Sequence, residues 1–251
     1  MKYFIFLLLF SHLIYSQKAD GYIDYQYLHK TDLVDKTKIR KAQFRIFFTP
    51  SKTFAYDLNK YNRSLEIAKQ LGDQNSEFKN EKNQIKPNDF IIIDLQKQIY
   101  NSFEYKNSSY LVKDTILQDW TILEDKKQIL NYSCQKAITN FRGRDYEAWF
   151  TSDIPVSFGP WKFNGLPGAI LSVVDKTGDV EFSAIKINTA QVDNIIEEPL
   201  YYEEVTKEKL AEINDNYTSQ INTNFTVTKN GEQYAPVPKI KKKINNPIEL
   251  Q

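Results

Sequence analysis

The chain of 251 residues carries 33 lysine and arginine residues against 32 aspartate and glutamate residues, which gives a formal net charge of +1. This balance provides no global attraction to nucleic acid or to an anionic surface, so we expect no nucleic-acid partner. Cys134 is the only cysteine, which excludes an intrachain disulfide.

The first 16 residues have the pattern of a secretory signal peptide. Lys2 supplies a short basic segment, an apolar run from Tyr3 to Phe10 follows, and Ser16 is a small residue suited to a cleavage site. The apolar run is shorter than the ~20 residues that a membrane span needs, and no later stretch is long enough. We therefore expect cleavage near Ser16, no transmembrane span, and a periplasmic or secreted protein.

Residues 21–57 have the alternating pattern of antiparallel strands. Aromatic and β-branched residues occupy every second position in three runs, and a Thr-Pro-Ser-Lys turn at 49–52 separates the last two. The alternating residues are Ile23, Tyr25, Tyr27, Phe44, Ile46, Phe48, Phe54, Tyr56 and Leu58. The short connection favours a hairpin in an antiparallel sheet.

Residues 59–89 interrupt this pattern, because they are rich in Asn, Lys, Gln, Glu and Asp and poor in aromatic residues. Ser64 can cap one or two helical turns that end near Leu71 and Gly72. We interpret the segment as a solvated insertion in the sheet, and a functional lid is the alternative.

Strand patterns return after residue 89 and continue to residue 188. The predicted strands are 90–94, 99–105, 110–113, 120–123, 129–139, 145–151, 169–175 and 180–188, with a turn at 125–127. Within 129–139, alternation places Leu130, Tyr132, Cys134 and Ile138 on one face. This face predicts a buried and inert thiol at Cys134, and a reactive nucleophile is the alternative.

A helix is predicted at Lys207–Asn224, where apolar residues recur at steps of three and four. The whole pattern predicts a mainly β fold: a curved antiparallel sheet or half-open β-barrel with one C-terminal helix packed on it. We expect residues 1–16 to be the signal peptide, residues 17–228 a single domain, and residues 229–251 an extended basic tail.

The stretch Gly159–Leu171, which reads G-P-W-K-F-N-G-L-P-G-A-I-L, places large apolar residues among glycines and prolines. The residues that predict a rigid loop held in turns are Gly159, Pro160, Gly165, Pro167 and Gly168. Either the loop is a corner that plugs the end of the core, or it is a site for a ligand or partner. The binding candidates are Trp161, Phe163, Asn164 and Leu166, with Arg142 and Arg144 of the preceding hairpin.

The segment Trp149–Leu171 resembles the GLPGLI family of secreted Bacteroidetes proteins, which is named for a six-residue signature. Ala169 stands where that signature has leucine. The strand N-Y-S-C-Q-K-A, the element G-R-x-Y-x-A-W-F and the ending N-P-I-E-L also look like the family pattern. The resemblance implies an exported protein with an envelope location, built on a GLPGLI-like β-rich domain, and it implies no activity.

Few kinds of chemistry are available. His29 is the only histidine after residue 16, and the sequence has no Ser-His-Asp, zinc-ligand or phosphate-loop motif. We therefore predict no metal site and no cofactor. The remaining polar constellation joins Asp145, Glu147 and Asp153 to the two arginines of the hairpin, and it fits either acid–base chemistry or a solvated hairpin.

Three functions remain open. The leading hypothesis is a non-enzymatic envelope protein that binds an apolar or amphipathic small molecule, or an envelope partner protein, at the concave sheet face and the loop Gly159–Leu171. The first alternative is a carboxylate-dependent hydrolase or transferase that uses the Arg142–Asp153 region. The second alternative is a structural or assembly module.

Overall fold

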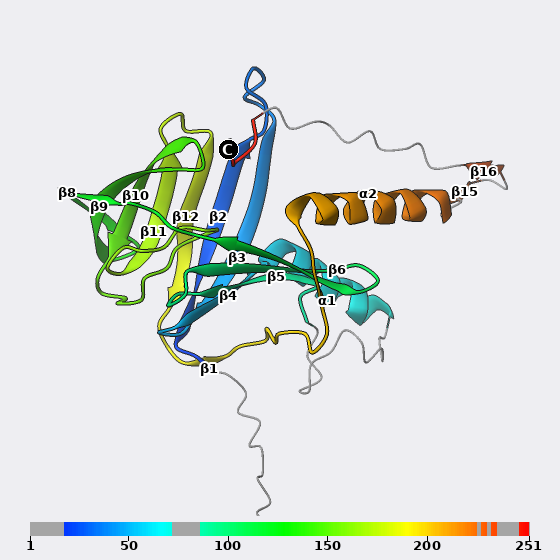
Figure 1. Cartoon of the computed structure of the whole chain (residues 1–251), viewed down its shortest axis with the longest axis horizontal. Coiled ribbons are helices and arrows are strands. Elements are labelled where there is room, and N and C mark those ends of the chain that lie inside the picture. The colour runs from blue at the N-terminus through cyan, green and yellow to red at the C-terminus, as the bar shows by residue number, and fades with distance from the viewer. Residues whose placement is uncertain (1–17, 72–85, 225–226, 230–231, 235–245, 251) are drawn as a thin grey trace, which may run out of the picture.

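A computed structural model of the chain describes residues 18–71, 86–224, 227–229, 232–234 and 246–250 (Figure 1). Its main feature is a sheet of 12 strands in the order β14-β7-β6-β5-β4-β3-β2-β12-β11-β10-β9-β8. All neighbouring strands are antiparallel except β14 and β7, which are parallel. Because β14 and β8 are left at opposite ends, the sheet is not closed into a barrel.

The strands of this sheet are β2 (Gly21–Lys30), β3 (Ile39–Phe48), β4 (Lys52–Asp57), β5 (Asp89–Asp94), β6 (Ile99–Tyr105), β7 (Ser109–Thr115), β8 (Thr121–Ile129), β9 (Tyr132–Phe141), β10 (Arg144–Thr151), β11 (Ala169–Asp175), β12 (Val180–Asn188) and β14 (Glu203–Glu204). Two short pairs complete the β structure of the described residues: β1 (Lys18–Ala19) with β13 (Val192–Asp193), and β15 (Val227–Lys229) with β16 (Glu232–Tyr234).

The sheet bends sharply between its two halves. Figure 1 shows β9–β12, β2 and β3 running together, whereas β4–β6 cross them at a steep angle. Ala55 of β4 belongs to the same buried apolar cluster as Tyr25 of β2 and Leu171 of β11, so the two halves share a core. The predicted mainly β architecture, a curved antiparallel sheet, is confirmed.

The predicted C-terminal helix is present as α2 (Lys207–Asn224), and the Thr206 hydroxyl accepts a hydrogen bond from the Lys209 N–H as an N-cap. Its Leu210 side chain is buried, and the helix contacts β7. The predicted helix is therefore correct in its bounds and in its contact with the sheet.

A further helix, α1 (Leu58–Leu71), begins earlier than the turns that we expected from Ser64. The Asp57 carboxylate accepts a hydrogen bond from the Lys60 N–H and caps the helix. The Ser64 hydroxyl instead donates to the Lys60 carbonyl, one turn back inside the helix. Residues 72–85 lie outside the described residues, so both interpretations of the polar insertion stay predictions.

The predicted strand 129–139 and the turn at 125–127 are wrong. The strand β8 continues through Lys127, and the reversal occurs at Leu130 and Asn131, whose φ angles are 48° and 71°. Leucine rarely adopts positive φ, so the alternating pattern concealed a two-residue hairpin turn. Leu130 and Ile138 are exposed, and they do not share a buried face with Cys134.

The predicted signal peptide and the lysines at 239–243 lie outside the described residues. Of the predicted basic tail, residues 246–250 are described and lie against the sheet. Figure 1 shows this terminal segment beside β2. No helix among the described residues is long and apolar enough to cross a membrane.

Candidate functional site

The loop between β10 and β11 is built by its own backbone contacts. Phe158 and Asn164 form an antiparallel bridge, and the Ile170 N–H donates to the Phe158 carbonyl at 2.8 Å. At Gly168, where φ is 154°, a Cβ would lie 2.0 Å from the Thr151 carbonyl oxygen. A side chain has no room there, so the backbone itself requires glycine.

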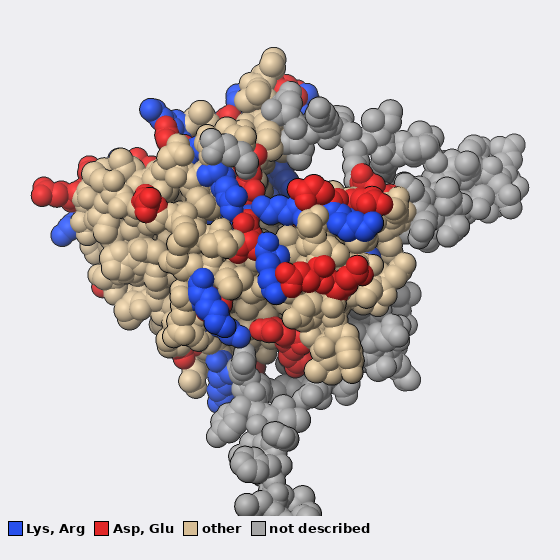
Figure 2. Space-filling view, viewed as in Figure 1, with Lys and Arg blue, Asp and Glu red and all other residues tan. Residues whose placement is uncertain are grey.

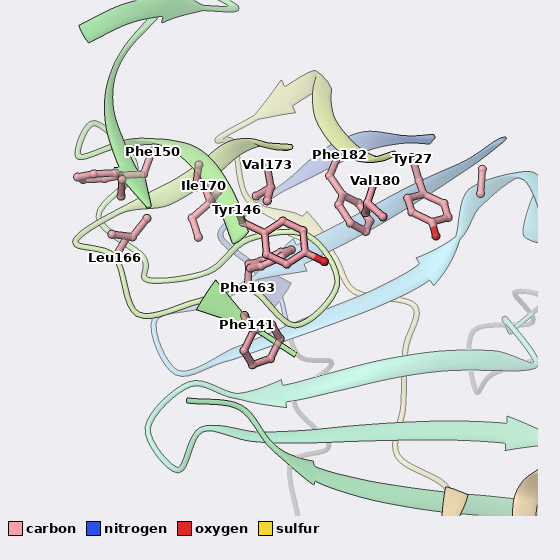
Figure 3. Close-up of a cluster of buried hydrophobic side chains, with 13 residues drawn as sticks. Tyr27, Phe141, Tyr146, Phe150, Phe163, Leu166, Ile170, Val173, Val180 and Phe182 are labelled. Atoms are coloured by element: carbon pink, nitrogen blue, oxygen red, sulfur yellow. The ribbon is translucent and has the colours of Figure 1, made fainter. Parts of the chain in front are cut away.

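Phe163 projects from this loop into the core. Its ring is fully buried and meets Tyr146 edge-on at 4.7 Å, with Phe141 at 5.8 Å and Phe182 at 6.3 Å. We call Tyr27, Phe141, Tyr146, Phe163 and Phe182 the aromatic cluster. Figure 3 shows Phe163 lying against Tyr146 in this cluster. Contacts of this kind fix ring orientation as well as burying apolar area.

Two tryptophans flank the aromatic cluster and keep part of their surface exposed. Trp161, with a φ of 55°, has its ring centroid 5.4 Å from Phe163 and 6.5 Å from the parallel ring of Phe182. Trp120 contacts Phe163 from the segment between β7 and β8, with 6.2 Å between centroids. Leu166 is fully buried in the same core.

Asn164 is buried and binds the segment between β7 and β8. Its carbonyl accepts a hydrogen bond from the Trp120 indole N–H at 2.7 Å, and its N–H donates to the Gln118 side-chain oxygen at 3.0 Å. Its own amide group donates to the Lys162 carbonyl. The structure therefore uses Phe163, Asn164 and Leu166 inside the fold and leaves Trp161 as the candidate of the loop with a partly exposed ring.

The two arginine candidates lie at opposite sides of the β9–β10 turn. Arg144 is buried and donates to Asp175 at 2.7 Å, whereas Arg142 is half-buried and donates to Asp114 at 2.8 Å. Arg142 itself occupies the turn with a φ of 51°, next to Gly143. The arginines consequently enter two different polar clusters.

Arg144 also binds the C-terminal residues Asn246–Leu250, which we call the tail segment. Its guanidinium donates to the Asn246 side-chain oxygen, to the Pro247 carbonyl at 2.6 Å and to the Ile248 carbonyl at 3.2 Å. The tail segment was missed as a site element by sequence reasoning. Its only signal was the N-P-I-E-L ending.

Arg142 belongs to a charge network whose other members are Lys162, Lys207, Asp114 and Glu249. Lys162 pairs with Asp114 at 2.7 Å and with Glu249, and Lys207 reaches the same two carboxylates at 3.0 and 3.4 Å. Burial alone would raise the pKa of Asp114, but the hydrogen bonds from Lys162 and Lys207 outweigh it and lower this pKa to about 2. Figure 2 shows basic and acidic side chains interleaved near the middle of one face.

His29 is buried beneath the tail segment, and its Nε2 lies 2.7 Å from the Asn246 carbonyl oxygen. A carbonyl only accepts, so this nitrogen carries the proton. Burial lowers the pKa of His29, the charges of Arg144 and Arg40 lower it further, and the bond to Asn246 opposes them. Burial thus favours the neutral form of His29, and its Nε2–H donates to the Asn246 carbonyl.

The carboxylates of the alternative enzyme site have separate partners. Asp145 accepts from Asn140, whereas Glu147 pairs with Lys136 at 2.7 Å and accepts from the Trp149 indole. The hydrogen bond from Lys136 lowers the pKa of Glu147. Asp153 lies in the turn after β10 and is exposed. A general acid needs a raised pKa, and Glu147 has the opposite shift.

Cys134 is buried on β9, and burial raises the pKa of its thiol to about 11. At neutral pH such a thiol is protonated and a weak nucleophile. Among the described residues no group of three or more His, Cys, Asp or Glu side chains is placed to hold a metal ion.

The chain is similar to known proteins in sequence and in fold. A family model described as "N-glycanase peptide, N-terminal domain" matches residues 58–212, which is more than half of the chain. No curated protein sequence matches. Structures of PNGF-II in space groups P21 and C2 both align with a TM-score of 0.56 at 16% sequence identity over 80% of this chain.

At this identity the alignments show a shared fold. The chain spans about a third of the length of the PNGF-II chains, covering 34% of one and 33% of the other.

Proposed function

The chain belongs to the N-glycanase N-terminal domain family, and from this premise we propose that it is an exported, non-catalytic module that binds a glycan-bearing partner. The match covers about a third of the aligned PNGF-II chains. A binding role needs only the surface of the matched fold.

The observation that carries this proposal is the pair of partly exposed tryptophans, Trp120 and Trp161, whose rings both contact the buried Phe163. Their rings are locked by the aromatic cluster, and a locked ring loses little entropy when it binds a ligand. Sugar rings are amphipathic, with C–H faces that pack on aromatic rings and hydroxyl groups at their edges.

Polar groups for those hydroxyl groups lie beside the rings. Gln118 bridges the loop and the β7–β8 segment, and the side chain of Arg142 keeps 27% of its surface exposed. This combination of fixed apolar faces and nearby polar groups is typical of binding sites for amphipathic ligands. It refines the predicted apolar or amphipathic ligand at the loop Gly159–Leu171 to a carbohydrate.

Export and membership of the GLPGLI family are parts of the same proposal. Export is supported by the apolar run Tyr3–Phe10, and family membership by the signature around Gly165 and Gly168. Intact mass of the protein recovered from its own envelope fraction tests export, with an N-terminus expected at Gln17. A protein that retains residues 1–16 would contradict it.

Calorimetric titration with an N-glycosylated peptide, and with the same peptide after removal of its glycan, tests the binding role. We expect binding of the glycosylated form alone and a loss of at least tenfold in affinity for Trp120→Ala. The matched control is Tyr201→Ala, which removes an aromatic ring that is 88% exposed and precedes β14 in the sequence. Equal binding of both peptides would indicate a protein partner, and binding of neither would favour the structural module.

A further inference from the structure

The residues of the tail segment Asn246–Leu250 are bound by groups from β2, β10, α2 and the loops between the strands. Asn246 is 1% exposed, and its side-chain amide donates to the Lys30 carbonyl at 2.8 Å and to Asp179 at 3.0 Å. Its side-chain oxygen accepts from Arg144. A carboxylate would lose the two donated bonds, so the position selects asparagine over aspartate.

The next residues are recognised by different means. Arg144 binds the carbonyl of Pro247, a residue that has no N–H to satisfy. Ile248 packs against the aromatic cluster. Glu249 pairs with Lys162 and Lys207, and the Leu250 N–H donates to the Arg142 carbonyl at 2.9 Å.

The groups that bind the tail segment also have partners of their own. Arg144 pairs with Asp175 at 2.7 Å, Asp179 with Lys36 at 2.6 Å, and Lys162 with Asp114 at 2.7 Å. Asp175 is fixed in turn by the N–H groups of residues 179 and 180. Removal of the tail segment would therefore leave the buried charges paired, which is the condition for a site that persists when empty.

We propose that this surface is a binding site for extended peptides of the pattern Asn-Pro-apolar-Glu, and that the chain's own tail segment occupies it in cis. A partner polypeptide with an exposed segment of this pattern displaces the tail segment and takes the same contacts. The specificity comes from the asparagine amide, the apolar third residue and the acidic fourth residue. This inference does not depend on the proposed glycan binding.

The full-length double variant Asn246→Ala, Glu249→Ala weakens the cis occupant without changing the site. A fluorescent peptide Asn-Pro-Ile-Glu-Leu-Gln, followed by polarisation, should bind this variant saturably and the unaltered chain at least tenfold more weakly. A matched peptide with alanine in place of the asparagine should lose at least tenfold in affinity. Equal binding of the two peptides, or no binding to the folded variant, would overturn the proposal.

A second measurement covers failure of the variant to fold. A protease site placed between residues 235 and 245 of the otherwise unaltered chain allows cleavage after folding. We expect the cleaved segment to dissociate on dilution, the remainder to keep its sheet by circular dichroism, and the fluorescent peptide to rebind. Unfolding of the remainder on loss of the segment would show that the segment is part of the core, and would overturn the proposal.

Discussion

Arg144 joins Asp175, which lies in the neighbouring strand β11, to Asn246 at the end of the chain, 102 residues away in sequence. Both of these partners are buried, and the guanidinium also binds two backbone carbonyls of the tail segment. The Arg144 side chain thus connects the start of β10 to the tail segment.

Arg144→Met should destabilise the protein strongly, because it leaves the carboxylate of Asp175 buried without its cation. Loss of one partner of a buried pair costs about 3–5 kcal/mol. Arg144→Lys should cost less, since it keeps the charge but loses the forked geometry. Urea denaturation of the two variants checks this order, and equal costs would show that the charge alone contributes nothing without the forked geometry.

Gly168→Ala should be far more damaging than Gly165→Ala. A Cβ at residue 168 would meet the Thr151 carbonyl oxygen at 2.0 Å, whereas at residue 165 its nearest neighbour would be Trp120 at 3.6 Å. Residue 165 has a φ of 92°, so its substitution carries backbone strain but no clash. Thermal unfolding of both variants is the measurement, and similar melting temperatures would contradict the close approach at residue 168.

Phe163→Ala should cost about 3–5 kcal/mol, because it empties a fully buried position. Trp161→Ala should cost less, since part of the Trp161 ring is exposed and less packing is lost. Chemical denaturation gives both values. A larger cost at Trp161 than at Phe163 would show that Trp161 is the true plug of the core and would weaken its assignment to a ligand site.

Cys134 should react with a thiol reagent only after the protein is denatured. The side chain is buried and its pKa is raised to about 11, so access and thiolate formation are both low at neutral pH. Mass spectrometry after brief labelling measures this directly. Rapid labelling of the native protein would restore Cys134 as a candidate nucleophile.

The sequence carried enough information for the strands whose apolar residues alternate, such as β2 and β3, and for the amphipathic α2. It failed where a residue adopts a conformation that its type disfavours, as Leu130 does at a φ of 48°. A local pattern cannot report such a turn, because the energy that maintains it comes from pairing of the flanking strands.

The candidate site was likewise predicted only in part from the sequence. Glycine and proline spacing indicated a rigid loop, and at Gly168 the Thr151 carbonyl oxygen leaves no room for a side chain. The contact between Arg144 and the tail segment could not be predicted from the sequence. It spans 102 residues, and its side chains are of types that are also common on protein surfaces.

Stability should fall as the pH is lowered from about 7 to 5, the range in which histidine titrates. Burial lowers the pKa of His29 below the usual histidine value of 6.5, so the unfolded chain takes up a proton before the folded chain does. The contribution of His29 to stability is complete above pH 6.5 and is lost as the pH falls through the folded-state pKa of this residue.

The groups around His29 support this sign. Protonation would place a cation near Arg144 and Arg40, and the attraction of Asp175 is a smaller influence. The sequence has two histidines, and the proposed cleavage near Ser16 would leave His29 as the only one, which would make the readout specific. Melting temperatures measured across this range should follow a slope in the unaltered protein and a flatter line in His29→Gln, whose amide can still donate to the Asn246 carbonyl. The same slope in both proteins would assign the pH dependence to other groups.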